Sequence, residues 1–430
     1  MVKTAPLYSN LQYMPNLIEI NLTIDKCYES VLKHVYQHIF MSNNRLEIVR
    51  IKRTDYFDYN QKTFYFYSTN SLSTWYSSTI RLLNIDLYDS KEMLIVMDNL
   101  PKIETLCIRL ESLQLQDNIE YKQLSTKVNF LTKFSLIAII IHYAALTSLI
   151  KYLEKLKYLS FYSDHVCGSH CNGENVFNRI IDGNILKNDI LSKLKQLEKF
   201  QFYIGSLSYI EMTNDDIITT FQSDEWQKWT IGCFTNKYRE DSSLINYCIY
   251  SLPYNFQLVD SMSKGFLSRT TNKTTSVSTW NNVYLMNLNR PLSLTLMQSI
   301  NETFPLLNEL CIEHFAELDD DLLTNKELIM PKIHTIQIEC ASINYDVRNI
   351  KCFLQLSSNL RTLIILNNFL YKLLNDIELH SVFNRIQYLN IIDTFDLNYL
   401  HKLLICFTSV KTLKLQLNRN DPIVKSIKQI

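Results

Sequence analysis

One spacing of apolar residues, apolar-x-x-apolar-x-apolar, recurs at a near-constant interval through the last third of the chain. Its six copies there are VYLMNL, LNELCI, IHTIQI, LRTLII, IQYLNI and VKTLKL, which begin at residues 283, 307, 333, 360, 386 and 410. The steps between these starts are 24, 26, 27, 26 and 24 residues. A single copy carries little information because apolar residues are common, whereas a series with steps of about 20–29 residues indicates a repeat protein.

The same spacing is present in the first half of the chain, where its steps are less even. The steps run from 21 to 41 residues, between copies that begin at Leu17, Leu46, Leu82, Ile103, Leu131, Leu156 and Leu197. Alternating apolar residues over short stretches predict β-strands, because successive side chains of a strand point to opposite faces. The seven copies here and the six above predict one parallel sheet of at least ten strands.

Between the predicted strands the pattern changes to that of amphipathic helices. Residues 396–407 begin with Asp396, a favoured N-cap, and continue with apolar residues at i, i+3 and i+4 spacing: Leu397, Leu400, Leu403, Leu404 and Phe407. Pro291 stands at an expected first helical position. Stacked strand–turn–helix units predict an α/β fold, a right-handed solenoid with a parallel sheet on the concave face and helices on the convex face.

The residues from 203 to 282 interrupt this rhythm. They hold Trp226, Trp229, Phe234, Tyr238 and Tyr247, followed by the Ser/Thr-rich run SRTTNKTTSVSTW. We expect degenerate repeats with an inserted loop here. The chain is therefore divided into irregular repeats over 1–202, this segment over 203–282, and regular repeats over 283–430.

The most apolar stretch of the chain, 134–150, raises the question of a membrane span. It is shorter than the roughly 20 apolar residues that a span needs, and it contains His142. A buried strand running into a buried helix is the better interpretation, and no membrane partner is expected.

Composition narrows the classes of function. Lys and Arg number 43, as do Asp and Glu, so the net charge is zero and nucleic acid is not an expected partner. Only six glycines are present, and neither GxGxxG nor GxxxxGK[ST] occurs, which argues against the nucleotide-dependent enzymes of those two classes. Ten scattered cysteines and an N-terminus without an apolar h-region favour an intracellular protein, cytoplasmic or nuclear.

The stretch SDHVCGSHCNGENV, 163–176, is the most conspicuous candidate for chemistry, since it contains His165, Cys167, His170 and Cys171. A structural zinc site usually takes two separated ligand pairs, and no second pair of suitable spacing is present. An exposed turn is therefore favoured over a metal site or a disulfide. The pair in HVYQH, 34–38, lacks the glutamate of a metalloprotease motif, and 316–323 lacks the spacing of a calcium loop. No metal, cofactor or catalytic residue is predicted.

The segment LRTLIILNNFL, 360–370, fits the template L-x-x-L-x-L-x-x-N-x-L at every fixed position. The chain thus resembles the intracellular class of leucine-rich-repeat proteins, and most of all the substrate-recognition region of F-box/leucine-rich-repeat proteins. Asp164, Gly205 and Ala341 stand at the template asparagine in other repeats. The resemblance implies a ubiquitin-ligase adaptor. No F-box sequence is visible, and 26–40 is explained as a repeat helix, so a Skp-type linker is an expected partner only if an F-box lies upstream.

Two functions follow from these observations. The leading one is a non-enzymatic scaffold that binds a protein partner on its concave face. The residues expected on that face flank the central apolar positions of five strands: Tyr158, Ser160, Tyr162, Lys199, Gln201, Tyr203, Glu309, Glu313, Gln337, Glu339, Tyr388 and Asn390. The alternative is an enzyme with its site in 203–282, where Cys233 and Cys248 are the candidate nucleophiles.

Overall fold

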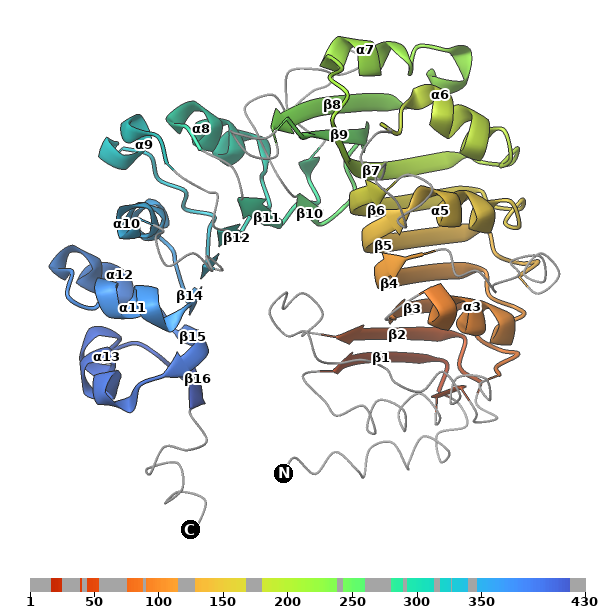
Figure 1. Ribbon diagram of the computed structural model, residues 1–430. Coiled ribbons are helices and arrows are strands. Elements are labelled where there is room, and N and C mark those ends of the chain that lie inside the picture. The colour runs from red at the N-terminus through yellow and green to blue at the C-terminus, as the bar shows by residue number, and fades with distance from the viewer. Residues whose placement is uncertain are drawn as a thin grey trace. The chain divides into compact units, whose positions relative to one another are not determined.

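The chain divides into two compact units in the computed structural model (Figure 1). Unit 1 comprises Met1–Leu252 with Arg269–Asn272, and unit 2 comprises Pro253–Ser268 with Lys273–Ile430. The boundary falls inside the irregular 203–282 segment. The structure describes residues 17–24, 39–40, 45–53, 76–87, 90–114, 128–167, 180–237, 243–259, 280–288, 292–312, 318–325, 327–338 and 346–417.

Unit 1 contains a nine-stranded sheet in the order β1-β2-β3-β4-β5-β6-β7-β9-β8. The first seven strands are parallel, whereas β9 is antiparallel to both β7 and β8. Their bounds are β1 Glu19–Ile24, β2 Ile48–Arg53, β3 Leu82–Asp86, β4 Thr105–Leu113, β5 Lys133–His142, β6 Tyr158–Cys167, β7 Lys199–Ser208, β8 Thr230–Lys237 and β9 Ile245–Leu252.

Helices α3, α5 and α6 lie along one face of this sheet (Figure 1). Alternate strand residues on that face are buried, as Leu106, Ile108 and Leu110 of β4 illustrate with exposures of 2% or less. Each such side chain contributes about 1.5–3 kcal/mol through removal from water. The helical segments of unit 1 are α3 Ser90–Asn99, α5 Tyr143–Ile150, α6 Gly183–Leu186, the π-helical η4 Lys187–Leu191, α7 Asn214–Thr219 and the 3₁₀ turn η5 Asp224–Trp226.

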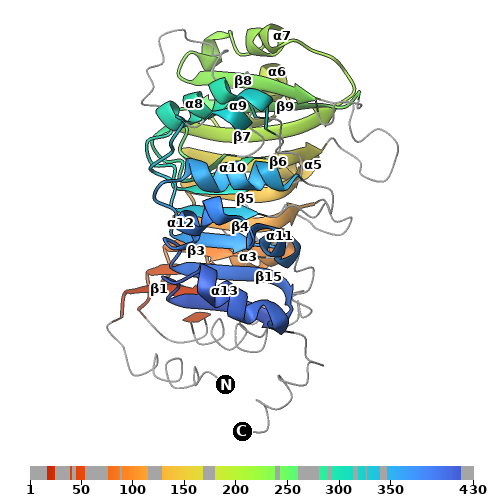
Figure 2. The ribbon, with the colours of Figure 1, turned by 90° about the vertical axis from the view of Figure 1, so that its left-hand side faces the viewer.

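Unit 2 contains a seven-stranded sheet, β10 to β16 in chain order, and every neighbouring pair is parallel. Figure 2 shows α10, α12 and α13 in front of the strands that they follow or precede. The strands are β10 Leu258–Val259, β11 Leu285–Leu288, β12 Glu309–Ile312, β13 Thr335–Ile338, β14 Thr362–Ile365, β15 Tyr388–Phe395 and β16 Thr412–Leu417. The helical segments are α8 Leu294–Thr303, α9 Asp320–Thr324, α10 Val347–Leu356, α11 Asn367–Leu373, η7 Ile377–Leu379, α12 His380–Phe383, η8 Leu397–Tyr399 and α13 Leu400–Cys406.

A recurring turn explains why the apolar spacing marks the strands so well. The first apolar residue of a copy donates its amide hydrogen to the carbonyl three residues earlier, as Ile103 does to Leu100 at 3.1 Å and Leu360 to Ser357 at 3.3 Å. The following amide then bonds to the preceding repeat, as Arg361 does to His334 at 2.9 Å. One buried residue therefore closes the turn and sets the register of the strand that follows it.

Each of the thirteen predicted copies corresponds to a parallel strand, β1–β7 and β11–β16. The copy at β3 begins two residues earlier than predicted, at Ile80, since Ile80, Leu83 and Ile85 are the residues with no exposure. The helix prediction for 396–407 is also confirmed. Asp396 accepts a hydrogen bond from the Asn398 amide at 2.9 Å, and η8 and α13 follow.

The prediction of one parallel sheet with at least ten strands is wrong for the described residues, which form two sheets. The reason lies in 230–252, where only the seven residues 238–244 connect β8 to β9. A parallel neighbour requires a long crossover, whereas antiparallel neighbours need only a short connection. The α/β class, with parallel-rich sheets and helices, is as predicted.

The apolar stretch 134–150 forms β5 followed directly by α5, which confirms the strand-into-helix interpretation. Within the described residues, every helix is too short or too polar to reach across a bilayer.

Candidate binding surface on the nine-stranded sheet

We call the face of the unit 1 sheet that lies away from α3, α5 and α6 the open face. Parallel register places its side chains in three rows that run across the strands. The first row contains Glu19, Ile48, Leu82, Thr105, Lys133, Tyr158 and Lys199. The second contains Asn21, Arg50, Asn84, Cys107, Ser135, Ser160 and Gln201, and the third contains Asp86, Arg109, Ile137, Tyr162, Tyr203 and Tyr250.

The first row places Tyr158 between two lysines. Lys133 of β5 and Lys199 of β7 are the register partners of Tyr158 on either side. Both lysines are exposed, and the tyrosine is half-buried. The Nζ atom of Lys199 lies 5.5 Å from the centroid of the Tyr158 ring, within the range of a cation–π contact. An aromatic ring with a positive charge on each side is therefore accessible at this point of the open face.

The second row holds the Tyr158 side chain in place from below. The Tyr158 hydroxyl and the Oε1 atom of Gln201 lie 2.6 Å apart in a hydrogen bond that the hydroxyl donates. Burial raises the pKa of Tyr158, and a hydrogen bond with Ser160 opposes this effect only in part. The phenol thus stays protonated and remains a donor at neutral pH. Gln201 and Ser160 are themselves buried, so they support the ring without being accessible to a partner.

The third row is an aromatic layer. The rings of Tyr162 and Tyr203 stack with centroids 4.7 Å apart and an interplanar angle of 12°. The Tyr203 hydroxyl lies 3.4 Å from the Sγ atom of Cys248 in a hydrogen bond from β7 to β9. Tyr162 and Tyr203 are each 2% exposed. Of the residues predicted for the partner surface in unit 1, Tyr158 and Lys199 are therefore accessible, while Ser160, Tyr162, Gln201 and Tyr203 lie beneath the surface.

Two arginines on the open face are paired with carboxylates. The guanidinium of Arg50 contacts the carboxylate of Glu19 and lies 3.2 Å from the Oδ1 atom of Asn21. Hydrogen bonds from Asn21 and Arg50 lower the pKa of Glu19. Arg109 approaches the buried Asp86 at 4.0 Å. These neighbours offset the positive charges of Arg50 and Arg109.

The predicted surface residues of unit 2 lie on the corresponding face of its seven-stranded sheet. Glu309, Gln337, Tyr388 and Asn390 are half-buried there, and the Lys414 Nζ atom lies 5.6 Å from the Tyr388 ring centroid. Glu313 and Glu339 fall outside the described residues. The predicted set is thus divided between two sheets, and Glu309 is the one charged residue among the four described unit 2 members.

The 163–176 stretch is only partly described. Ser163 to Cys167 form the end of β6, where the Ser163 hydroxyl donates to the Ile139 carbonyl at 3.2 Å, while 168–176 lie outside the described residues, as do His34 and His38. The described residues contain no group of three or more His, Cys, Asp or Glu side chains arranged to hold a metal ion. Of the acidic run 316–323, residues 318–323 are described, and α9 begins among them at Asp320.

Trp226 and Tyr247 of the 203–282 segment belong to the unit 1 core, whereas Tyr238 falls outside the described residues. Trp226 is 1% exposed and contacts Phe221 with ring centroids 4.7 Å apart, and Trp229 packs against it at 5.9 Å. Cys233 and Cys248, the candidate nucleophiles of the alternative function, are fully buried. Burial also raises the pKa of Cys233, which disfavours the reactive thiolate.

This burial predicts that unit 1 loses stability in alkali. Burial raises the pKa of Cys233 above its ordinary 9.0 and that of Tyr250 above its ordinary 10.0. Both groups ionise more readily in the unfolded chain, so the stability present below pH 9 should be lost as the pH rises further. We expect the urea midpoint of unit 1 to fall between neutral pH and about pH 10. A Cys233→Ala, Tyr250→Phe variant should have a flatter profile, and an equally steep one would contradict the prediction.

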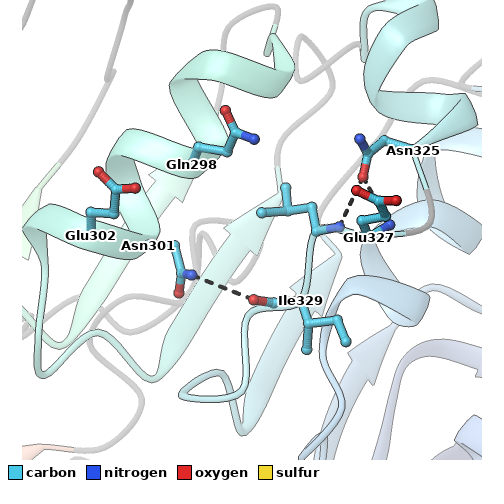
Figure 3. Close-up of a pocket in the computed structure, with 7 residues that line it drawn as sticks. Gln298, Asn301, Glu302, Asn325, Glu327 and Ile329 are labelled. Atoms are coloured by element: carbon cyan, nitrogen blue, oxygen red, sulfur yellow. Dashed lines mark hydrogen bonds between the residues drawn. The ribbon is translucent and has the colours of Figure 1, made fainter.

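A small polar pocket of about 340 Å³ lies on the helix side of unit 2, a feature that the sequence did not indicate. Figure 3 shows its lining, which comes from α8 and the loop after α9: Gln298, Asn301, Glu302, Asn325, Glu327, Leu328 and Ile329. The Asn301 side chain donates to the Ile329 carbonyl at 3.4 Å, and Asn325 Oδ1 accepts from the amides of Glu327 and Leu328 at 2.9 and 2.8 Å. Both asparagine side chains are therefore used to hold the loop, and the two titratable side chains among the lining residues are Glu302 and Glu327.

Two comparisons with known proteins, by family model and by sequence, identify no relative of this chain. No protein-family model matches the chain, and no curated protein is significantly similar to it.

Proposed function

We propose that this chain is a protein-binding scaffold without catalytic activity, built as a leucine-rich-repeat solenoid, whose open face in unit 1 receives the partner. The observation that carries the proposal is the in-register row of accessible side chains across β1 to β7, on the face away from the helices. A solenoid repeats one small unit and so presents an extended surface to a partner.

The repeated local geometry supports the solenoid part of the proposal. The turn closed by Ile103 in unit 1 recurs in unit 2 at Leu360, and each is followed by a parallel strand. Helices then return the chain to the start of the next strand, as α10 does between β13 and β14. The same hydrogen bonds in successive repeats are what one supersecondary unit, copied along a chain, produces.

The partner that we propose is a protein delivered to a ubiquitin ligase, and this step rests on the resemblance of the repeats to those of F-box adaptors. The chain as given is not expected to bind the Skp-type linker directly. The enzyme alternative is weakened because Cys233 and Cys248 are each 0% exposed and so are shielded from a substrate.

Photo-crosslinking tests the proposed face. Benzoylphenylalanine placed at Thr105 or Ser135, which are half-buried on the open face, is expected to crosslink a partner in cells. Lys91, exposed on α3 at the helix side of the same unit, is the matched control and should not crosslink that protein. A partner that crosslinks from Lys91 but from neither open-face position would contradict the proposal.

A further inference from the structure

We propose that Lys133, Tyr158 and Lys199 form a docking row for an acidic segment of the partner protein. This inference rests on the proposed function and deepens it, because it assigns the chemistry of what binds. The three residues come from adjacent strands β5, β6 and β7 and occupy the same register position. We call them the lysine–tyrosine row.

The charge of this row is not neutralised within the described part of the chain. Arg50 is paired with Glu19 and Arg109 with Asp86, whereas neither lysine of the row has a carboxylate within ion-pair distance among the described residues. Glu198, next to Lys199 in sequence, is paired with Lys157 at 3.2 Å. Two exposed positive charges, without a carboxylate partner among the described residues, thus stand two strands apart, and complementary charge selects an acidic ligand.

The row also fixes a spacing. Adjacent strands lie about 4.8 Å apart, so the backbones at Lys133 and Lys199, two strands apart, are separated by about 10 Å. Residues i and i+3 of a polyproline II segment point to the same side and lie about 9.3 Å apart. An extended segment that crosses the strands, with acidic residues three positions apart, can therefore set one carboxylate against each lysine.

Tyr158 lies between these charges and provides a firm apolar surface. Its hydroxyl is held by Gln201 at 2.6 Å, so the ring does not need to be ordered when the partner binds. Preorganised groups lose less conformational entropy on association. A side chain between the two acidic residues would pack on this ring, and the half-buried Ser135, two residues beyond Lys133, adds a hydroxyl beside one carboxylate site.

A protein segment fits this surface better than a nucleic acid. Phosphate-backbone binding draws on many cations, and the chain has 43 basic against 43 acidic residues. Two lysines around one tyrosine make a small site, suited to two or three side chains of a peptide.

The test is fluorescence anisotropy of a labelled Glu-Pro-Pro repeat peptide with the full chain. Saturable binding is expected, and Lys133→Glu combined with Lys199→Glu should weaken it by at least about tenfold, because both attractions become repulsions. Added salt should weaken the wild-type interaction. The matched control is Lys155→Glu with Lys195→Glu, which changes the net charge equally at two exposed positions before β6 and β7 and should leave binding unchanged.

Further variants separate the roles within the row. Tyr158→Ala should weaken binding, and Tyr158→Phe should weaken it less, because the apolar ring remains while the hydrogen bond to Gln201 that holds it is lost. A Gln-Pro-Pro peptide with the same label should bind weakly. Circular dichroism should be native-like for every variant, since the lysines are exposed and the tyrosine is half-buried.

Several results would overturn the inference. They are the absence of saturable binding of the acidic peptide, equal loss in the control pair, equal binding of the glutamine peptide, or tighter binding of an oligothymidylate. Photo-crosslinking distinguishes failure of the acidic-ligand inference from failure of the proposed scaffold function. A partner captured from Thr105 or Ser135 while the acidic peptide fails would leave the scaffold function in place and remove only the acidic ligand, whereas failure of both would remove both.

Discussion

Replacing Trp226 with alanine is expected to lower the free energy of unfolding of unit 1 by about 3–5 kcal/mol. The indole is 1% exposed and lies in an aromatic cluster with Phe221, Trp229 and Phe202, at centroid distances of 4.7, 5.9 and 6.2 Å. Its Nε1 atom donates to the Gly183 carbonyl at 3.2 Å. The substitution therefore leaves a cavity and a buried carbonyl without its donor, two separate sources of destabilisation.

Urea unfolding followed by circular dichroism measures this change, and hydrogen exchange locates it. Because the chain has two compact units, hydrogen exchange in the variant should become faster in β7 and α6, while unit 2 keeps its protection. Gln227→Ala, at the exposed neighbouring position, is the control and should change stability by no more than about 0.5 kcal/mol. A loss below about 1 kcal/mol in Trp226→Ala would mean that the cluster is not packed as described.

The sequence predicts the strands well because one physical requirement sets the pattern. In most copies the first apolar residue is buried and closes the turn, and the next two apolar positions face the helices. Both requirements act within six residues, so the pattern can be recognised in the sequence without knowledge of the fold. Only at β3 does the predicted start of a copy differ from the observed one. Leu82 fits the apolar spacing but lies on the open face, whereas the buried residue that begins this copy is Ile80.

The antiparallel strands β8 and β9 are harder to predict, because prediction depends on this repeated pattern. The Trp229 amide closes a turn on the Trp226 carbonyl at 2.9 Å before β8, as in a repeat, but the alternation in β8 and β9 does not tell which existing strand they will join. The close approach of β6 and β7 is also invisible in the pattern. A Cβ atom on Gly205, at the template asparagine position, would lie 2.0 Å from the Asp164 carbonyl oxygen. Only glycine fits there, which explains the departure from the template.

The predicted partner surface illustrates a related limit. A period of two assigns a residue to a face, but it does not tell whether that face is covered. Tyr162 and Tyr203 lie on the open face as predicted and are nevertheless 2% exposed, because they stack on each other in a larger aromatic layer. Lys133 was not among the predicted surface residues. A signal for it exists, since Lys133, Tyr158 and Lys199 each stand two residues after the first apolar residue of their copies.

Replacing Leu363 with alanine is expected to lower the free energy of unfolding of unit 2 by about 2–5 kcal/mol. Leu363 is 0% exposed in β14, and its register partners on the neighbouring strands are Ile336 and Leu389, which are also 0% exposed. The truncated side chain leaves a cavity in a layer that continues from strand to strand, so the loss of contacts is not confined to one repeat.

The adjacent residue provides the matched control for this change. Ile364 also belongs to β14 but points to the opposite face and is half-buried, so Ile364→Ala should cost clearly less than Leu363→Ala. Urea unfolding of both variants, with hydrogen exchange to identify the unit that changes, makes the comparison. Equal losses, or a larger loss for Ile364→Ala, would show that the side chains of β14 alternate in the other sense. The register on which the rows of unit 2 depend would then have to be shifted by one residue.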